Sequence, residues 1–363
     1  MEKEQVKELL REYMTTPALA GYEKHMAYLF REKIRPYCDE VEIDRIGNVI
    51  GTIRGTDPES PAVMISAHMD NIGFFVKMID DRGFLILERN GSPQEKVIPG
   101  CTLVVETDSG EYINGTFCIK PVQLMSESEQ YTVTPLSNLY VDIGCDSREE
   151  ANALGVYVGC PVMYTPSFTE LQGGRCRGTF VDDRGGCAAV TVAAELLGEK
   201  RPASTVYVVG TVWEEFNLRG SMIANRTHRA EININVDGAG PTIDPGKEQI
   251  YEEVCAPGIS MFNFHGRGTL NGCIPQEGLV RLAEEVDRDM DLHLFRRASR
   301  GGLCDTSYIQ LENEGVACID LCRPSQYGHS YNEVTDVEGV QKTGILLAEM
   351  VQRIGRDFPL QRL

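Results

Sequence analysis

The sequence has few of the features that mark membrane, secreted or nucleic-acid-binding proteins. No segment approaches the roughly 18 continuous apolar residues of a membrane-spanning helix, and the charged start Met1–Gln5 lacks the apolar stretch of a secretory signal. Basic residues are in the minority, with 35 Lys and Arg against 54 Asp and Glu and a formal net charge of -19. We therefore expect no binding to nucleic acid or to anionic membranes, and a cytoplasmic location.

Closely spaced cysteine pairs are also absent. The 12 cysteines are scattered from Cys38 to Cys322 and include no Cys-x-x-Cys pair. Several of them, such as Cys187, Cys304 and Cys318, lie among small or apolar residues, which suits a buried thiol. The sequence therefore predicts reduced core cysteines and no disulfide framework.

Helices and buried strands alternate in the first and last parts of this chain of 363 residues, which is long enough to bury a sizeable core. Helical periodicity is present in residues 2–14, and residues 188–197 are rich in Ala, Val and Leu. A continuous apolar run, typical of a strand buried on both faces, occupies residues 62–67, and further strands are predicted at residues 205–211, 232–236 and 316–321. We expect an α/β domain with a mixed sheet flanked by helices, formed by residues 1–73 and 165–363.

A different pattern occupies residues 74–164. Short apolar runs alternate there with turn residues, and Asp80–Gly83 lies between two such runs as a hairpin turn would. A short helix is predicted near Ser147–Ala153. We expect this segment to form a small β-barrel or sandwich inserted into the α/β domain.

The predicted strands end close to side chains that can bind metals. The metal-capable residues that follow these strands are His68 and Asp70, Glu214 and Glu215, Asp237, and, within a loop, His329. Asp182 precedes the predicted helix at residues 188–197. If the strands are parallel, the residues after them face one crevice at the carboxyl edge of the sheet. Each residue alone could be a core histidine, a solvated acid or a turn, but together they favour a metal centre.

A two-metal centre would give this set of residues a purpose. Two divalent ions about 3.5–4 Å apart need a bridging carboxylate together with separate nitrogen and oxygen ligands on each ion. Such ions lower the pKa of a water molecule, and a nearby carboxylate that is not a ligand can take its proton.

The motifs resemble those of the tetrahedral aminopeptidase family, which includes glutamyl and deblocking aminopeptidases. The resemblance runs through nearly the whole chain, and its motifs include His68-x-Asp70-x-Ile-Gly, Asp182-x-Arg-Gly-Gly, Glu214-Glu215-x-x-Leu-Arg-Gly and Tyr327-x-His-Ser-x-x-Glu333. It implies a zinc-peptidase-like fold and the removal of N-terminal residues from peptide substrates.

The resemblance also implies a role for each candidate residue. The implied ligands are His68, Asp182 and Asp237 for the first metal, and Asp182, Glu215 and His329 for the second. Asp182 would bridge the two metals, Glu214 would be the general base, and Asp70 would orient His68 through its far nitrogen. The two ions would be zinc or cobalt, with manganese as a further option. Residues 74–164 would mediate dimerisation, and six dimers would close into a dodecamer.

Several residues beside the proposed site depart from the family's pattern. They are Asn71, Asp183, Phe216, Asn217, Cys304 and Gln326. Gln326 stands beside Tyr327 at the position where the family has an arginine. The nearby arginine of this chain, Arg323, lies at a different position. These departures bear on substrate preference, and the sequence fixes neither the preferred N-terminal residue, the native metal nor the pathway.

Three other functions are compatible with the sequence. A different dinuclear amidohydrolase, such as a carboxypeptidase or a deacylase, would use a similar set of ligands. An endoglucanase-type glycoside hydrolase is suggested by the pair Glu214 and Glu215, although such an enzyme needs two opposed carboxylates and no metal. A metal-bound scaffold without activity is the third alternative.

Overall fold

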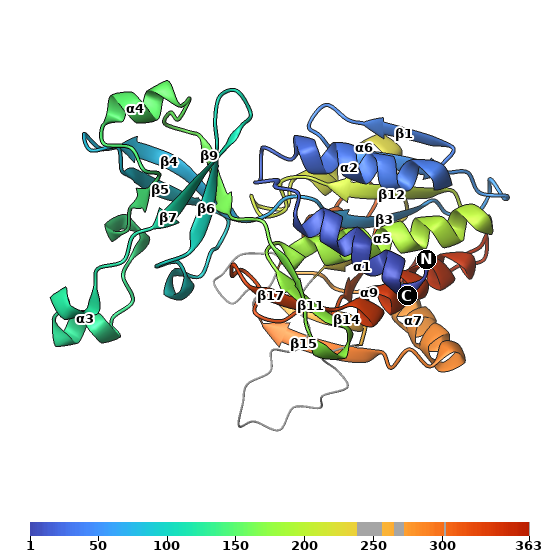
Figure 1. Cartoon of the computed structure of the whole chain (residues 1–363). Coiled ribbons are helices and arrows are strands. Elements are labelled where there is room, and N and C mark those ends of the chain that lie inside the picture. The colour runs from blue at the N-terminus through green and yellow to red at the C-terminus, as the bar shows by residue number, and fades with distance from the viewer. Residues whose placement is uncertain (238–255, 265–271, 301–302, 363) are drawn as a thin grey trace.

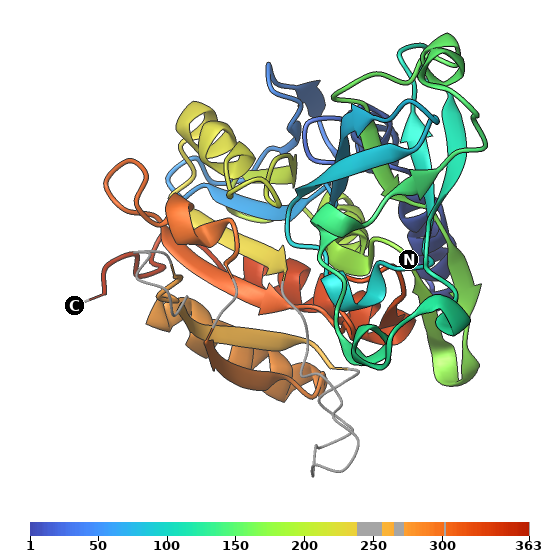
Figure 2. The same cartoon turned by 90° about the vertical axis from the view of Figure 1, so that its left-hand side faces the viewer.

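The chain folds into two units that lie side by side (Figure 1). The computed structural model describes residues 1–237, 256–264, 272–300 and 303–362. An α/β unit carries the marked N- and C-terminal ends, and a smaller β-barrel projects from it; Figure 2 shows the molecule with the barrel toward the viewer. The predicted fold class, a mixed sheet with helices and an inserted β-barrel, is confirmed.

The α/β unit is built on an eight-stranded mixed sheet. Its strands, in spatial order, are β1 (Glu40–Ile43), β2 (Val49–Ile53), β12 (Val206–Thr211), β3 (Val63–His68), β13 (Ile232–Asp237), β16 (Ala317–Cys322), β14 (Gly258–Phe264) and β15 (Phe295–Arg300). The four central strands β12, β3, β13 and β16 are parallel, as expected for strands whose carboxyl ends share one edge. The predicted apolar runs became these strands.

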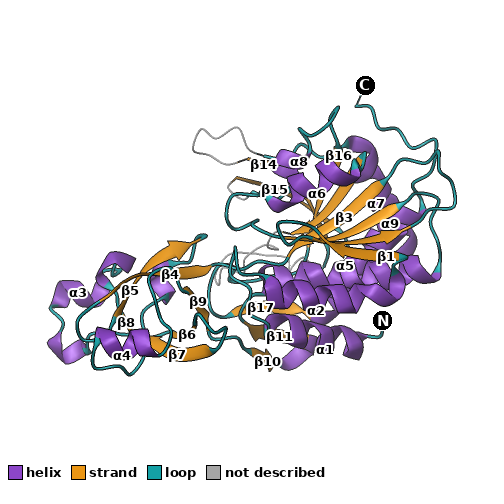
Figure 3. Cartoon of the chain, turned by 90° about the horizontal axis from the view of Figure 1, so that it is seen from above, coloured by secondary structure: helices purple, strands orange, loops and turns teal. Residues whose placement is uncertain are grey.

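The two faces of the sheet differ in chemistry. In β3, Ile65 and Ala67 belong to the main apolar core, whereas Met64, Ser66 and His68 alternate with them. The helices that cover the apolar face are α1 (Lys3–Met14), α2 (Lys24–Ile34), α5 (Val181–Glu199) and α9 (Val337–Gln352) (Figure 3). Helices α6 (Gly220–His228) and α8 (Thr306–Ile309) pack against the other face, and α7 (Glu277–Met290) packs beside α9. His68, the candidate ligand at the end of β3, therefore lies on the more polar face of the sheet.

The second unit is a closed six-stranded barrel. Its strands, in spatial order, are β4 (Gly73–Ile79), β5 (Leu85–Asn90), β8 (Val141–Asp142), β7 (Tyr112–Phe117), β6 (Thr102–Glu106) and β9 (Pro161–Tyr164). Phe74 meets Phe117 and Tyr164 edge-on in its core, with ring centroids 5.2 and 5.7 Å apart. Two short helices, α3 (Glu127–Tyr131) and α4 (Arg148–Ala153), lie on its outside, and Ser147 caps α4.

A small three-stranded sheet lies between the barrel and the helical layer. It consists of β10 (Phe168–Glu170), β11 (Arg175–Gly178) and β17 (Glu333–Asp336), in that order. Strand β17 leads directly into α9, where the side chain of Asp336 caps the helix by accepting a hydrogen bond from the Gly339 amide.

The described residues contain neither a disulfide bond nor a helix long and apolar enough to cross a membrane.

Candidate metal centre

The site lies where the central parallel strands end. His68 is the last residue of β3 and pairs in register with Thr211 of β12, while Asp237 is the last residue of β13. Glu214 and Glu215 lie in the segment after β12, beyond Val212 and Trp213. The chain therefore brings these groups to one edge of the sheet because parallel strands share the position of their carboxyl ends.

Asp182 lies between the two candidate histidines. Its Oδ1 is 3.3 Å from Nε2 of His68, and its Oδ2 is 3.6 Å from Nε2 of His329. The residues around it fall into groups whose ligand atoms lie within 4.8 Å of one another. The groups are His68, Asp182 and Asp237; Asp182, Glu215 and His329; and His68, Glu214 and Glu215. The first two match the ligand sets implied by the sequence resemblance.

Both histidines are held in the same tautomer by backbone carbonyls. Nδ1 of His68 donates to the carbonyl of Asp70 over 3.1 Å, and Nδ1 of His329 donates to the carbonyl of Ser92 over 3.0 Å. A carbonyl can only accept, so each Nδ1 carries a hydrogen, and each Nε2 faces Asp182 and is the nitrogen left for a metal. Metal-ligating histidines are usually oriented in this way.

The carbonyl that orients His329 comes from the barrel. Ser92 and Gln94 lie in the loop that follows β5, and the Gln94 side chain donates to the carbonyl of Gly328 over 2.8 Å. The Gln94 amide also donates to the carbonyl of His329 over 3.2 Å. This barrel loop and the His329 loop are thus fastened together.

Asp70 organises the segment that carries the two glutamates. Its carboxylate accepts the backbone N–H of Glu214 over 3.0 Å and that of Glu215 over 2.9 Å. The same carboxylate lies 3.7 Å from Nδ1 of His68, farther than the Asp70 carbonyl. Nδ1 of His68 therefore contacts the backbone carbonyl of Asp70, and the side chain of Asp70 instead holds the backbone of Glu214 and Glu215.

The two adjacent glutamates face different histidines. Glu214 Oε2 is 3.8 Å from Nε2 of His68, and Glu215 Oε1 is 3.6 Å from Nε2 of His329. Burial raises the pKa of the Glu215 carboxyl to about 7 against the opposing effect of His329. Burial raises the pKa of Glu214 well above its ordinary value, with nearby carboxylates adding to the rise.

Two residues of the site were given no role from the sequence. Glu333 of β17 accepts the backbone N–H of Asp182 over 2.9 Å and that of His329 over 2.8 Å, so it joins two candidate ligands. The buried side chain of Arg323 donates through Nη2 to Oδ1 of Asp182 over 2.8 Å, and its Nε donates to Asp183. Glu333 is the last residue of the motif Tyr327-x-His-Ser-x-x-Glu333, and this motif was the only indication of Glu333 in the sequence.

The positive charge of Arg323 affects both neighbouring aspartates. Burial opposes ionisation of Asp182, but Arg323 and the two histidines hold the pKa of this carboxyl well below its usual range. Burial raises the pKa of Asp183 to about 7 despite Arg323. Asp182 is thus held ionised, as a bridging ligand must be.

Three of the other departures from the family pattern have structural partners. The Asn71 side chain accepts hydrogen bonds from the Ala18 amide and from Arg184, away from Asp182. The backbone of Gln326 pairs with Val334, and the half-exposed ring of Phe216 lies under a surface arginine. Of the departures, Asp183 has the most direct link to the site, through Arg323.

The donor set is chemically suited to divalent metals. Imidazole nitrogen and carboxylate oxygen are ligands of zinc, cobalt and manganese, and the partly buried Asp182 belongs to two of the three groups and faces a different histidine with each oxygen. A cluster of this kind at the carboxyl edge of a mixed sheet is compatible with a metal-dependent hydrolase.

The chain belongs to the M42 glutamyl aminopeptidase family, whose model matches residues 47–346. It is similar to the lysyl aminopeptidase of Pyrococcus furiosus, with 30% identity over 353 residues that cover 96% of this chain and 97% of the relative. It also resembles the solved aminopeptidase APDkam598 from the archaeon Desulfurococcus kamchatkensis, with 27% identity, a TM-score of 0.90 and coverage of 99% and 97%. The protein is therefore a peptide hydrolase of a metal-dependent family.

A further structure shares the fold. The TET1 peptidase of Pyrococcus horikoshii, which can assemble into a tetrahedron or a large octahedral shell, is 23% identical with a TM-score of 0.82, and the match covers 96% of this chain and 99% of that one.

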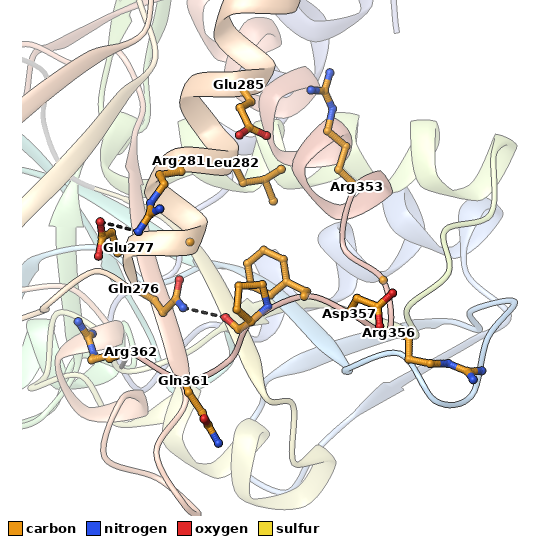
Figure 4. Close-up of a pocket in the computed structure, with 14 residues that line it drawn as sticks. Gln276, Glu277, Arg281, Leu282, Glu285, Arg353, Arg356, Asp357, Gln361 and Arg362 are labelled. Carbon is orange, nitrogen blue, oxygen red and sulfur yellow. Dashed lines mark hydrogen bonds and ion pairs between the residues drawn. The ribbon is translucent and has the colours of Figure 1, made fainter.

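A separate cavity of about 600 Å³ lies between α7 and the C-terminal segment (Figure 4). None of the candidate metal ligands lines it. Three of its arginines are paired with carboxylates: Arg281 with Glu277, Arg353 with Asp289, and Arg356 with Asp57. The cavity is thus distinct from the metal centre, and carboxylates already pair with the positive charges of these three arginines.

Proposed function

We propose that the protein is a dinuclear-metal aminopeptidase that removes N-terminal residues from peptides. His68, Asp182 and Asp237 would hold one metal, and Asp182, Glu215 and His329 would hold the other. The observation that carries this proposal is the placement of Asp182, whose two oxygens each face the Nε2 of a different histidine. Zinc and cobalt are the proposed metals, with manganese as a further option.

Glu214 is the proposed general base. When bound, the metals would polarise the substrate carbonyl and lower the pKa of water. Glu214 would accept the proton of the water whose oxygen attacks the carbonyl carbon, and the same carboxyl would return that proton to the amine nitrogen as the C–N bond breaks. The buried position of Glu214 beside His68, outside the two proposed ligand sets, supports this role.

The role of Asp70 is to place the glutamates. Its carboxylate binds two successive backbone N–H groups, which fixes the orientation of Glu214 relative to Glu215. Misplacement of a reacting group by about 1 Å can cost on the order of 100-fold in rate. We therefore assign Asp70 a positioning role.

An assay of substrate class tests the proposed function. Purified protein loaded with zinc, cobalt or manganese is offered aminoacyl arylamides, N-acylated peptides and peptides with a free carboxyl end. We expect amine release from substrates with a free N-terminus. Preference for N-acylated substrates or release from the carboxyl end would instead identify a deacylase or a carboxypeptidase.

We further propose that residues 74–164 form an assembly domain and that residues 1–73 and 165–363 form the catalytic domain. The segment between β7 and β8 exposes Ile119, Leu124 and Tyr131, whose side chains are 59%, 67% and 85% accessible. A second copy of the chain would cover this apolar surface. The Pyrococcus horikoshii peptidase can assemble into a tetrahedron or a large octahedral shell, which supports self-association of this chain. The assembly that we propose is a dodecamer of six dimers. The cytoplasmic location stays a prediction from the sequence.

A further inference from the structure

We propose that Arg323 makes the two metal positions unequal, so that the metal at Asp182, Glu215 and His329 binds more tightly than the metal at His68, Asp182 and Asp237. This inference rests on the proposed two-metal function. It concerns the order in which the metals bind, which the ligand residues alone do not determine.

Arg323 is built into the site. It follows β16 directly, and its side chain is fully buried. Its stem lies against Gly185 of α5, where a Cβ would come within 2.6 Å of the arginine Cδ. Any larger residue at position 185 would displace the arginine, so the glycine provides the space that Arg323 occupies.

The guanidinium contacts only one side of the proposed bridge. Nη2 of Arg323 lies 2.8 Å from Oδ1 of Asp182, the oxygen that faces His68. Within the part of the chain that the structure describes, Arg323 donates to Oδ1, whereas Oδ2 of Asp182 and the carboxylate of Glu215 face His329. The arginine therefore lies on the side of one of the two proposed metal positions.

This asymmetry has two physical consequences. The N–H of Arg323 uses a lone pair of Oδ1 that would otherwise be available to a metal. The fixed positive charge also repels a cation bound to the same oxygen, and this repulsion falls with distance toward Oδ2. Since arginine stays protonated in proteins, neutral pH does not relieve the repulsion. We expect the dissociation constants of the two positions to differ by about 10-fold or more.

Calorimetric titration of the metal-free chain with zinc tests the inference. The unmodified protein should bind two metals in separate steps. Arg323→Met, which keeps a buried stem without the charge, should tighten the weaker step by about 10-fold and bring the two steps together. Arg323→Lys should keep the separation because the charge remains. Arg201→Met removes a surface pair with Asp39 and serves as the matched control, with both steps unchanged.

A second pair of variants assigns the steps even if Arg323→Met fails to fold. Glu215→Gln should lose the tighter step, and Asp237→Asn should lose the weaker one. Equal steps in the unmodified protein, a separation unchanged in Arg323→Met, or the reverse assignment would overturn the inference. Two equal steps would leave the proposed function intact, whereas absence of any zinc binding would refute the two-metal function itself.

Discussion

Replacement of Glu214 by glutamine separates the roles of two adjacent residues. Glu214 lies beside His68, and Glu215 lies beside His329 and Asp182, so the two carboxylates are not interchangeable. Glutamine keeps the size of the side chain but cannot accept the proton. We expect Glu214→Gln to retain both metals and to bind peptide almost normally.

The size of the effect follows from the proposed role. Loss of a general base typically lowers the rate by about 10²- to 10⁴-fold, which corresponds to roughly 3–5 kcal/mol in the activation free energy. In Glu215→Gln the main loss should be of metal, because the charged oxygen beside His329 is removed. Activity in that variant should partly recover with excess metal.

The assay combines arylamide hydrolysis with metal analysis of the same samples. Glu59→Gln, an exposed carboxylate outside the site, is the matched control and should behave as the unmodified protein. Loss of a metal in Glu214→Gln together with two retained metals in Glu215→Gln would show that the roles are reversed. Full activity in Glu214→Gln would refute its role as the base.

Four further results are expected. Dialysis against a chelator should abolish hydrolysis and zinc or cobalt should restore it; full activity of metal-free protein would contradict the proposal. Glu215 raises the pKa of His329 to about 9 in the metal-free chain, and a metal needs the neutral imidazole, so metal affinity measured by titration should rise with pH toward about 9 and weaken below it. Asp70→Asn should lower both the rate and the free energy of unfolding, the latter by about 1–3 kcal/mol, because one of two buried N–H groups loses its acceptor; denaturant unfolding beside the rate would test this. Leu124→Glu should shrink the assembly seen by light scattering, whereas a stable and active monomer of the unmodified protein would count against an assembly role for the barrel.

The sequence predicted the parts of the fold that have a strong local pattern. The run at residues 62–67 is almost entirely apolar, and apolar residues alternate with asparagine in residues 232–236, so the buried parallel strands β3 and β13 could be recognised and their ends located. Edge strands such as β15 and β10 were not predicted, because short or half-exposed strands lack a distinctive pattern.

In the candidate site, too, the residues that could be predicted are those with a local sequence pattern. Residues directly after buried strands, such as His68 and Asp237, could be selected because the strand ends place them. The roles of Arg323 and Glu333 depend on contacts with Asp182, which is 141 and 151 residues away in sequence. No periodicity encodes such a contact, so only the folded chain reveals it.

The barrel loop with Ser92 and Gln94 contacts the His329 loop, and this contact links the two units of the chain. An inserted unit is often regarded as a detachable accessory to a complete enzyme. Here the carbonyl of Ser92 fixes the tautomer of His329, and Gln94 binds the backbone of the same loop. A chain shortened to the α/β unit would lose these partners of a candidate ligand. Without the insert, this histidine would need another support, so the two units depend on each other at the candidate site.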